Sequence, residues 1–277
     1  MEPTVARQMY RTIEPFHGFV YLVPEAEEEY AALGIHGRMG YFASRSAPMG
    51  PVPAEVVIAT FYNFSPALVR RAIPAAWALA SPEALLVARL RVVDRVLRAV
   101  LGEEALAGPE VAEALELARM AAAGCEPVGR SLYAGHASLP WPDEPHLALW
   151  HALSLVREYR GDGHIAALVA EGYSGCDAIV THVAAGDIPK AFAASRAWTD
   201  DEWAASEDSL RARGLMDESG ALTDAGRASR QWVEDRTDAL AMPAWEPLGE
   251  EGCRRLRHLV RPWSKAIVSD AFPRALR

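Results

Sequence analysis

The sequence predicts a mainly α-helical protein with one small β-hairpin in its C-terminal half. Apolar residues recur at helical spacing in several segments, and residues 214–223 place two short apolar runs around a glycine-containing turn. The chain has 277 residues, 51% of them hydrophobic, enough for one large domain or two ordinary ones. Three prolines between Leu139 and Pro145 indicate a linker. We therefore expect an N-terminal helical domain over residues 1–140 and a second domain over residues 141–277.

Capping signals place the helices of the first half. Pro24 suits a first helical turn, the glutamates after it favour the positive end of the helix dipole, and Gly34 ends the helix. N-cap serines followed by proline mark two further starts. The predicted segments are Glu25–Leu33, a start at Ser65–Pro66, a start at Ser81–Pro82 with helical spacing over Ala84–Leu101, and Pro109–Ala123.

The second half predicts more helices and the hairpin. Thr199 and Glu202 form a capping box, and the glycines around Asp162 are expected to break one helix and begin another at His164. Leu215–Met216 and Ala221–Leu222 are the two apolar arms of the hairpin. The predicted helices are His146–Arg160, His164–Glu171, Ser174–Ala185, Thr199–Arg213, Thr223–Leu240 and Glu250–Leu259.

Composition and charge exclude several classes of protein. The chain holds 37 acidic and 28 basic residues, a net charge of −9, which argues against nucleic-acid binding through bulk positive charge. Three widely spaced cysteines indicate neither a disulfide framework nor a thiolate zinc site, and they favour a reducing cytoplasm. Neither a signal peptide nor an apolar run long enough to span a membrane is found in the sequence. We expect a cytoplasmic protein without a membrane partner.

The order of helices followed by a small hairpin and another helix resembles a winged helix. The segments 210–216 and 222–226 are similar to the wing of MarR-type regulators. Over most of its length the chain resembles an actinobacterial helix-turn-helix family of uncertain role, on the segments 40–48, 60–66, 157–164 and 237–241. The resemblance implies a winged-helix-like fold, a homodimer and DNA binding, and it implies no catalytic residues. Tandem winged helices are the alternative architecture.

The charges of the predicted reading surface argue against ordinary operator binding. The hairpin turn Asp217–Ser219 and the helix start Asp200–Glu202 are acidic, and acidic groups repel phosphate. Residues 253–277 are the exception, with seven basic residues and only Asp270 acidic. One interpretation pairs these arginines with acidic neighbours, and the other makes them contacts to phosphate or to an anionic ligand.

Two polar clusters are the candidate functional residues. In the first, Arg160 is a candidate anion clamp and His164 a candidate acid/base, oriented by Asp162; the alternative is that Asp162 caps a helix beginning at His164. In the second, His17 lies in an apolar stretch, as a core histidine or as a pocket residue with a tuned pKa. Loop residues Arg45, Tyr62 and Asn63 are further candidate ligand contacts.

The sequence therefore predicts a small-molecule-binding protein of winged-helix ancestry, acting as a ligand-responsive regulator with weak or lost DNA binding. The alternative is an enzyme that reuses the scaffold, with His17 and His164 as acid/base groups and Arg45 and Arg160 binding an anion. The ligand pocket should lie between the domains. No metal site is expected, because no HExxH motif occurs. No cofactor is expected either, and haem bound by a histidine is the alternative.

Overall fold

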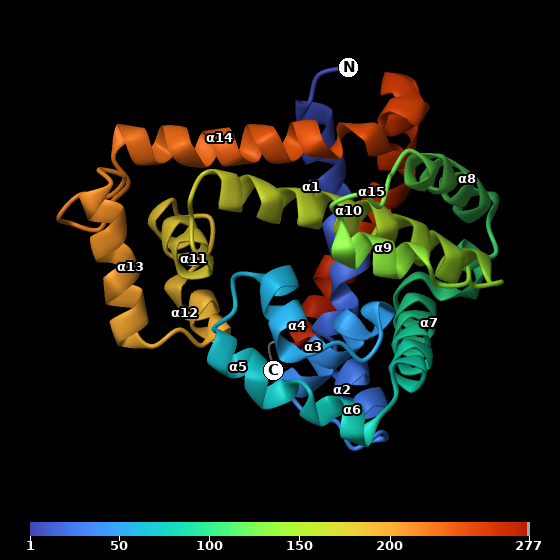
Figure 1. The fold of residues 1–277 in the computed structure, drawn as a ribbon. Helices are drawn as coiled ribbons and strands as arrows, with labels where there is room; N and C mark the ends of the chain where they lie inside the picture. Colours follow the sequence, from blue (N-terminus) through green and yellow to red (C-terminus); the bar gives the residue numbers. More distant parts are fainter. Residues whose placement is uncertain (276–277) are drawn as a thin grey trace.

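The computed structural model describes the backbone of residues 1–275 and the side chains of residues 1–271. Over this range the chain is all α-helical (Figure 1). The helices are α1 Thr4–Gly18, α2 Pro24–Ala31, α3 Arg38–Ser46, α4 Ala54–Phe61, α5 Pro66–Ala72, α6 Ala75–Leu79, α7 Pro82–Leu106, α8 Pro109–Ala123, α9 Ser131–Ala137, α10 Pro145–Ala170, α11 Gly175–Ala184, α12 Lys190–Ala193, α13 Asp200–Ala212, α14 Asp224–Ala241 and α15 Gly249–Ala275. None of these helices is apolar over a stretch that could cross a membrane.

The predicted β-hairpin is wrong. Residues 214–223 make one isolated antiparallel bridge, between Met216 and Leu222, and no strand occurs in the described range. The Asp217 carboxylate accepts hydrogen bonds from the backbone N–H groups of Ser219 (2.9 Å) and Ala221 (3.0 Å), which curls the segment into a tight loop. Thr223 is already the N-cap of α14, so the segment is too short to form the second strand of the predicted hairpin. Both the winged-helix-like fold and the tandem winged-helix alternative are therefore replaced by an all-α fold.

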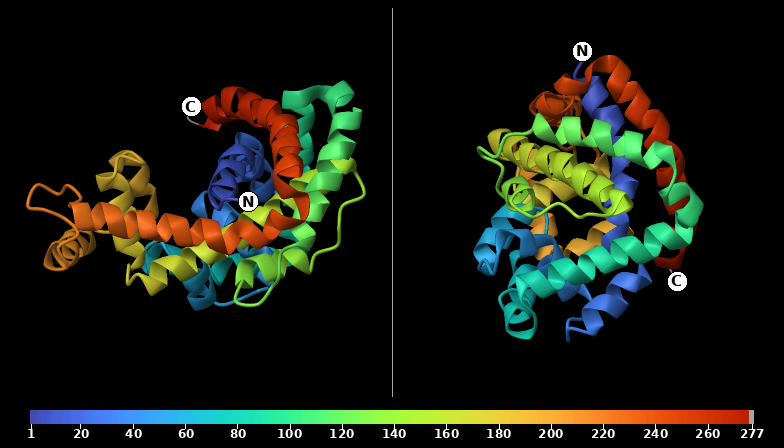
Figure 2. Two further views of the ribbon diagram at one scale, coloured as in Figure 1. Left: turned by 90° about the horizontal axis from the view of Figure 1, so that it is seen from above. Right: turned by 90° about the vertical axis from the view of Figure 1, so that its right-hand side faces the viewer.

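The helices form a main body and a smaller unit at its side (Figures 1 and 2). In the main body α1 packs along α15, so both ends of the chain share one core, from Ala6 to Ala271. A second core, which includes Leu168, Tyr173 and Leu210, holds α11, α13 and the adjoining part of α14 together; we call residues 167–233 the distal unit. The helix α14 runs from the distal unit to the main body (Figure 1). The predicted domain boundary at residue 140 stays a prediction.

Several of the expected caps are present. Ser81 accepts a hydrogen bond from Ala84 N at 3.2 Å at the start of α7. Thr199 and Glu202 form the expected capping box at α13. A second capping box, between Ser174 and Asp177, begins α11. These local signals fix where the helices begin, because they satisfy backbone N–H groups that have no partner within the helix.

The glycines on either side of Asp162 do not interrupt the helix, contrary to expectation. One helix, α10, continues through them to Ala170, so no separate helix begins at His164. A Cβ atom on Gly163 would lie 2.3 Å from Nη1 of Arg130. Arg130 donates to the backbone oxygens of Tyr159 and, at 2.9 Å, of Leu240. Gly163 therefore permits the close approach of an arginine that ties α10 to α14.

A short pattern, Gly-Arg-x-x-Tyr, occurs twice in the chain, at residues 37–41 and 129–133. Gly37 and Gly129 have positive φ angles of 57° and 70°, and each precedes the start of a helix, α3 or α9, that carries Tyr41 or Tyr133. A proline-rich loop and a further helix, α4 or α10, follow each copy. The candidate site lies between these two sets of helices.

Candidate ligand-binding site

A buried network of charges lies where α1, α3 and α10 meet. Arg45 forms a bidentate ion pair with Glu158, with Nε 3.0 Å from Oε1 and Nη2 2.8 Å from Oε2. Arg157 donates from Nη1 to the same Oε2 at 2.7 Å and from Nε to Glu14 Oε2 at 2.9 Å. Two arginines thus neutralise two glutamates. Glu158, Arg157 and Glu14 were not among the predicted site residues.

Glu158 is ionised and His17 is neutral in this network. Burial opposes the ionisation of Glu158, but Arg45 and Arg157 outweigh it and hold the pKa of Glu158 well below its ordinary value. Burial lowers the pKa of His17 well below its ordinary value, although Glu158 opposes this. His17 Nδ1 is hydrogen-bonded to Ser154 Oγ at 2.9 Å, and its Nε2 lies 3.6 Å from Glu158 Oε1. The ring therefore packs in the core as an uncharged group.

Two adjoining pockets share Tyr41, Arg45, Arg157 and Arg196 as lining residues, and we call them together the central cavity. Their volumes are about 150 Å³ and 260 Å³. Six of the seven predicted site residues line the central cavity: His17, Arg45, Tyr62, Asn63, Asp162 and His164. Aromatic rings of α3, α4 and the loop after α4 form much of its wall.

Tyr62 and Asn63 hold the loop after α4 to the distal unit. The Tyr62 hydroxyl donates to the backbone oxygen of Tyr173, and the Asn63 backbone oxygen accepts from Trp198 Nε1 at 3.0 Å. A Cβ atom on Gly175 would lie 2.1 Å from the Tyr62 oxygen, so the first turn of α11 also touches this loop. The wall of the cavity is thus in direct contact with α11 and with the segment before α13.

Asp162 and His164 have structural partners within the helices. Asp162 Oδ2 accepts from the backbone N–H of Tyr133 at 3.0 Å, so it caps α9 and not a helix at His164. Burial raises the pKa of Asp162 to about 6, although the Tyr133 hydrogen bond opposes this. His164 Nδ1 is hydrogen-bonded to Thr237 Oγ1 at 2.9 Å, and burial with the charge of Arg160 lowers its pKa to about 3. The imidazole is therefore neutral at pH 7.

Arg196, which the sequence did not single out, is the cation without a carboxylate partner in the central cavity. No ion pair of Arg196 occurs within the described part of the chain, its Nε has no hydrogen-bond partner, and Nη1 donates to Ser195 Oγ at 2.7 Å. Its guanidinium carbon lies 4.4 Å from the ring centroid of Phe64. Burial lowers the pKa of Arg196, and the nearby Tyr41 only partly opposes this. A partly buried cation of this kind favours an anion beside it.

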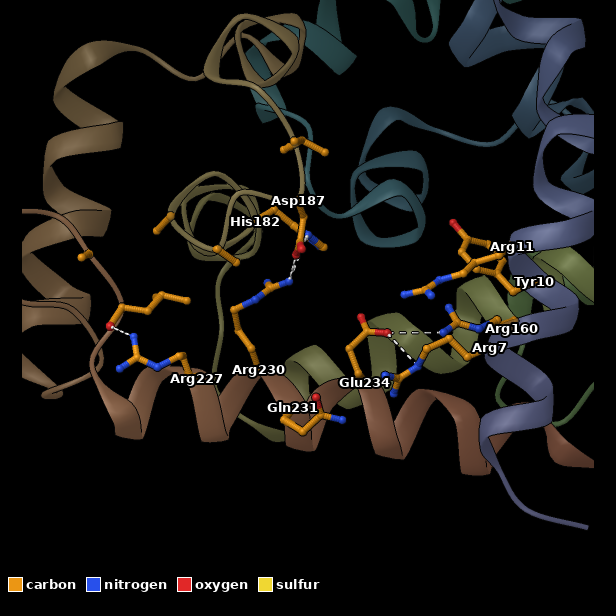
Figure 3. A pocket seen from close by; sticks show the side chains of 15 residues that line it. Arg7, Tyr10, Arg11, Arg160, His182, Asp187, Arg227, Arg230, Gln231 and Glu234 are labelled. Atoms are coloured by element: carbon orange, nitrogen blue, oxygen red, sulfur yellow. Dashed lines mark hydrogen bonds and ion pairs between the residues drawn. The ribbon is translucent and has the colours of Figure 1, made fainter. Parts of the chain in front are cut away.

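Arg160 does not join the other predicted residues. It lines a separate cleft of about 860 Å³ between α1, α14 and the end of α11 (Figure 3). Arg160 Nη2 lies 3.0 Å from Asp238 Oδ1, and Glu234 reaches both Arg160 and Arg7 (Figure 3). Across the cleft Arg230 pairs with Asp187. Arg7, Arg160 and Arg230 are thus each paired with a carboxylate, so Arg160 serves as a structural ion pair.

The described side chains contain no group of three or more His, Cys, Asp or Glu residues that could hold a metal ion. The three cysteines are buried. Burial raises the pKa of Cys125 to about 12 and those of Cys176 and Cys253 to about 11, so none is a thiolate at neutral pH.

Helices α11 and α13 pack against each other as the helix pair of the distal unit. The Ser206 hydroxyl of α13 donates to Asp177 Oδ1 of α11 at 2.5 Å. The first turn of α13 is acidic and exposed, at Asp200–Asp201. Arg211 pairs with Glu207 and Asp208 of the same helix. The outer face of α13 thus presents negative charge.

The comparisons with known proteins identify one family. The model of a helix-turn-helix family matches residues 6–273, nearly the whole chain. No curated protein and no solved structure matches the chain. The MarR-like wing has no counterpart in the described residues. The chain therefore belongs to the helix-turn-helix family.

Proposed function

We propose that this protein is a ligand-responsive regulator that binds a small organic anion in the central cavity. The observation that carries the proposal is Arg196, a partly buried guanidinium whose Nε has no hydrogen-bond partner and which has no carboxylate partner among the described residues. Arg45 and Arg157 in the same cavity are neutralised by Glu158 and Glu14, so Arg196 is the charge left for a ligand. A carboxylate would supply the missing acceptor through charge-assisted hydrogen bonds.

The lining favours an aromatic or alkyl carboxylate. Tyr41, Phe61 and Phe64 line one of the two pockets, and Arg196 lies over the ring of Phe64. Apolar walls with a few placed polar groups are typical of small-molecule sites. The modest pocket volumes of about 150 Å³ and 260 Å³ suit a compact ligand.

The position of Arg196 offers a route from the ligand to the helix pair. Arg196 ends a short 3-10 turn, and α13 begins four residues later at Asp200. The Arg196 backbone oxygen accepts from Ser65 N at 2.9 Å, which joins this segment to the loop that lines the cavity. An anion that draws the guanidinium inward would therefore shift the start of α13.

The helix-turn-helix family suggests a DNA-binding regulator, and the acidic face of α13 indicates that its affinity for duplex DNA is low. The enzyme alternative needs His17, Arg45, Arg160 and His164 in one pocket. Arg160 lines a different cleft, and both histidines are neutral at pH 7. The geometry therefore favours binding over acid–base chemistry. The homodimer and the cytoplasmic location stay predictions.

Native mass spectrometry of the freshly purified protein, followed by calorimetric titration with benzoate, salicylate and hexanoate, tests the proposal. We expect at least one carboxylate to bind, and Arg196→Met to weaken that binding about tenfold or more. Arg254→Gln is the matched control, because Arg254 is exposed on α15 and lies outside the cavity. Binding of the carboxylate that is unchanged in Arg196→Met, or no binding by any of the three, would contradict the proposal.

A further inference from the structure

A second positively charged site lies in the main body, between α1 and α15. Arg11 of α1 and Arg257, Arg261 and Lys265 of α15 line a groove of about 490 Å³, which we call the basic groove. Figure 2 shows α15 curving across the main body with α1 beside it. Among the described residues, Pro15 lines both the groove and the central cavity, and none of the groove's cationic side chains lines the central cavity.

The charge of the basic groove is not neutralised. None of the described residues that line it is acidic, although the whole chain has a net charge of −9. Arg11, Arg261 and Lys265 have no ion pair among the side chains that the structure describes. By contrast Arg255, on the same helix, pairs with Glu113 at 2.5 Å. The pairing of these arginines with acidic neighbours, one of the two sequence interpretations, therefore holds for Arg255 and not for the groove.

Arg257 is oriented but incompletely bonded. Its Nη1 donates to Gln8 Oε1 at 3.1 Å, and its Nε is buried without a hydrogen-bond partner. The two helices are held together here, because the Ser264 hydroxyl donates to the Thr12 backbone oxygen at 2.6 Å. The groove is thus a formed feature of the helix packing, with at least one donor left for a ligand. Arg274 and Arg277, which the sequence groups with these residues, lie outside the described side chains.

The spacing of the cations indicates the ligand. Arg257, Arg261 and Lys265 are four residues apart, which places them along one face of α15 at intervals of about 6 Å. A row of cations this long suits several linked negative groups better than one. None of the described residues that line the groove is aromatic, so these residues offer no stacking surface for a nucleobase. Arginine and lysine together are typical ligands of phosphate oxygens.

We propose that the basic groove binds the linked phosphates of an oligophosphate-bearing small molecule. Inorganic oligophosphate and a nucleoside triphosphate both carry this chemistry. The cations of α15 contact successive phosphates, and Arg11 closes the groove from α1. The site does not depend on the ligand proposed for the central cavity.

Calorimetric titration of the whole protein at low salt tests this inference with tripolyphosphate, orthophosphate, ATP and a duplex DNA fragment as probes. We expect tripolyphosphate to bind at least about tenfold more tightly than orthophosphate, because several cations act together. The affinity for tripolyphosphate should fall steeply as the salt concentration is raised. ATP should match tripolyphosphate if the phosphates alone are recognised. ATP binding much more tightly would identify a nucleotide as the source of the phosphates and would keep the phosphate site.

The double variant Arg261→Gln/Lys265→Gln should weaken tripolyphosphate binding about tenfold or more, whereas Arg254→Gln on the same helix should leave it within about twofold. Circular dichroism checks that both variants fold. Equal affinity for orthophosphate and tripolyphosphate would overturn the inference, as would unchanged binding in the double variant. Binding of the duplex through Arg261 and Lys265 without any binding of tripolyphosphate would overturn it too and assign the groove to DNA.

Discussion

Arg45 and Glu158 form a two-point ion pair that joins α3 to α10, with Arg45 only slightly exposed. The two contacts are 3.0 Å and 2.8 Å, and the Glu158 side chain has no exposed surface. Residues 113 positions apart in the chain are thereby fixed at the centre of the fold. Because each charge is buried, removing one leaves the other without compensation.

Glu158→Gln should lower the free energy of unfolding by about 3–5 kcal/mol, since Arg45 and Arg157 then lose the carboxylate between them. Urea denaturation at pH 7 measures the change. The matched control is Glu218→Gln, at an exposed position, which should change stability by less than about 0.5 kcal/mol. A loss for Glu158→Gln as small as that of the control would show that the network is not a determinant of stability.

Asp162→Asn should alter the pH dependence of stability. Burial raises the pKa of Asp162 from 3.8 to about 6, so the folded protein keeps a proton that the unfolded chain releases. The contribution of Asp162 to stability therefore falls as pH rises from about 4 to about 6, by about 3 kcal/mol in all. The side-chain oxygen of asparagine can still accept the hydrogen bond from the Tyr133 N–H. Because asparagine does not titrate, the variant should not lose this stability as pH rises. Comparing unfolding free energies of wild type and variant at pH 4.5 and pH 7.5 measures it, with the exposed Asp143→Asn as control.

If the difference between Asp162→Asn and wild type is the same at both pH values, Asp162 is ionised throughout and the raised pKa is wrong. A variant that is more stable than wild type at the higher pH supports the prediction.

His136 should stay neutral in acid. Its Nε2 faces Arg89 Nη1 at 3.2 Å and must accept, and its Nδ1, 2.9 Å from the Leu132 oxygen, must donate. Burial and Arg89 lower its pKa from 6.5 to about 3. The stability that the neutral ring contributes is complete above about pH 6.5 and is lost as pH falls, by about 2 kcal/mol at pH 5. Nitrogen NMR of labelled histidine should show a proton on Nδ1 and none on Nε2 at pH 5; a doubly protonated ring there would contradict the assignment.

Removing negative charge from α13 should raise its affinity for duplex DNA. The variant Asp200→Asn/Asp201→Asn keeps the Thr199–Glu202 capping box and removes two exposed carboxylates. We expect affinity in gel-shift assays at low salt to increase about two- to tenfold. The charge-matched control Asp143→Asn/Glu144→Gln lies before α10 and should have a smaller effect. If both double variants behave alike, α13 does not face the duplex.

Gly175→Ala should disturb the contact between α11 and the cavity wall. The added Cβ would lie 2.1 Å from the Tyr62 backbone oxygen, so backbone must move, at a cost of about 1–3 kcal/mol. Gly161→Ala in α10 is the control, because its Cβ would meet neighbours only at 3.4 Å. Thermal unfolding should separate the two variants clearly. A Gly175→Ala protein as stable as the control would mean that α11 and Tyr62 are loosely packed.

Features that depend on local signals in the sequence were predicted better than features that depend on long-range contacts. The cap at Ser81 and the capping box at Thr199 depend on residues within a few positions, and both are present. The predicted break at Gly161–Gly163 was wrong because a tertiary contact decided it, and the predicted hairpin at 214–223 was wrong because local hydrogen bonds form a tight loop instead. Arg130, thirty-three positions before Gly163, fills the space that its missing side chain leaves. At the hairpin, the Asp217 carboxylate and the Thr223 cap use up the residues that a second strand would need.

The candidate site was predicted in part. Loops rich in glycine and proline drew attention to Arg45, Tyr62 and Asn63, which do line the central cavity, and whether they bind a ligand stays a prediction. Arg160 was assigned to the same cluster as Asp162 because it is two positions away, but on a helix two positions lie on opposite faces. Arg196 was missed because its unpaired state depends on what surrounds it. The repeated Gly-Arg-x-x-Tyr pattern, which the sequence analysis did not use, is a signal that would have pointed to the two sets of helices around the cavity.

The helix α14 has a mechanical consequence for any signal that passes between the two parts of the molecule. It runs unbroken from Asp224 to Ala241, about 27 Å, with one end in each part. A stiff rod of that length converts a tilt of a few degrees at its anchored end into a displacement of an ångström or two at its tip. The helix pair would therefore swing as a lever arm instead of unfolding, and a small event in the body could reposition α13 as a whole.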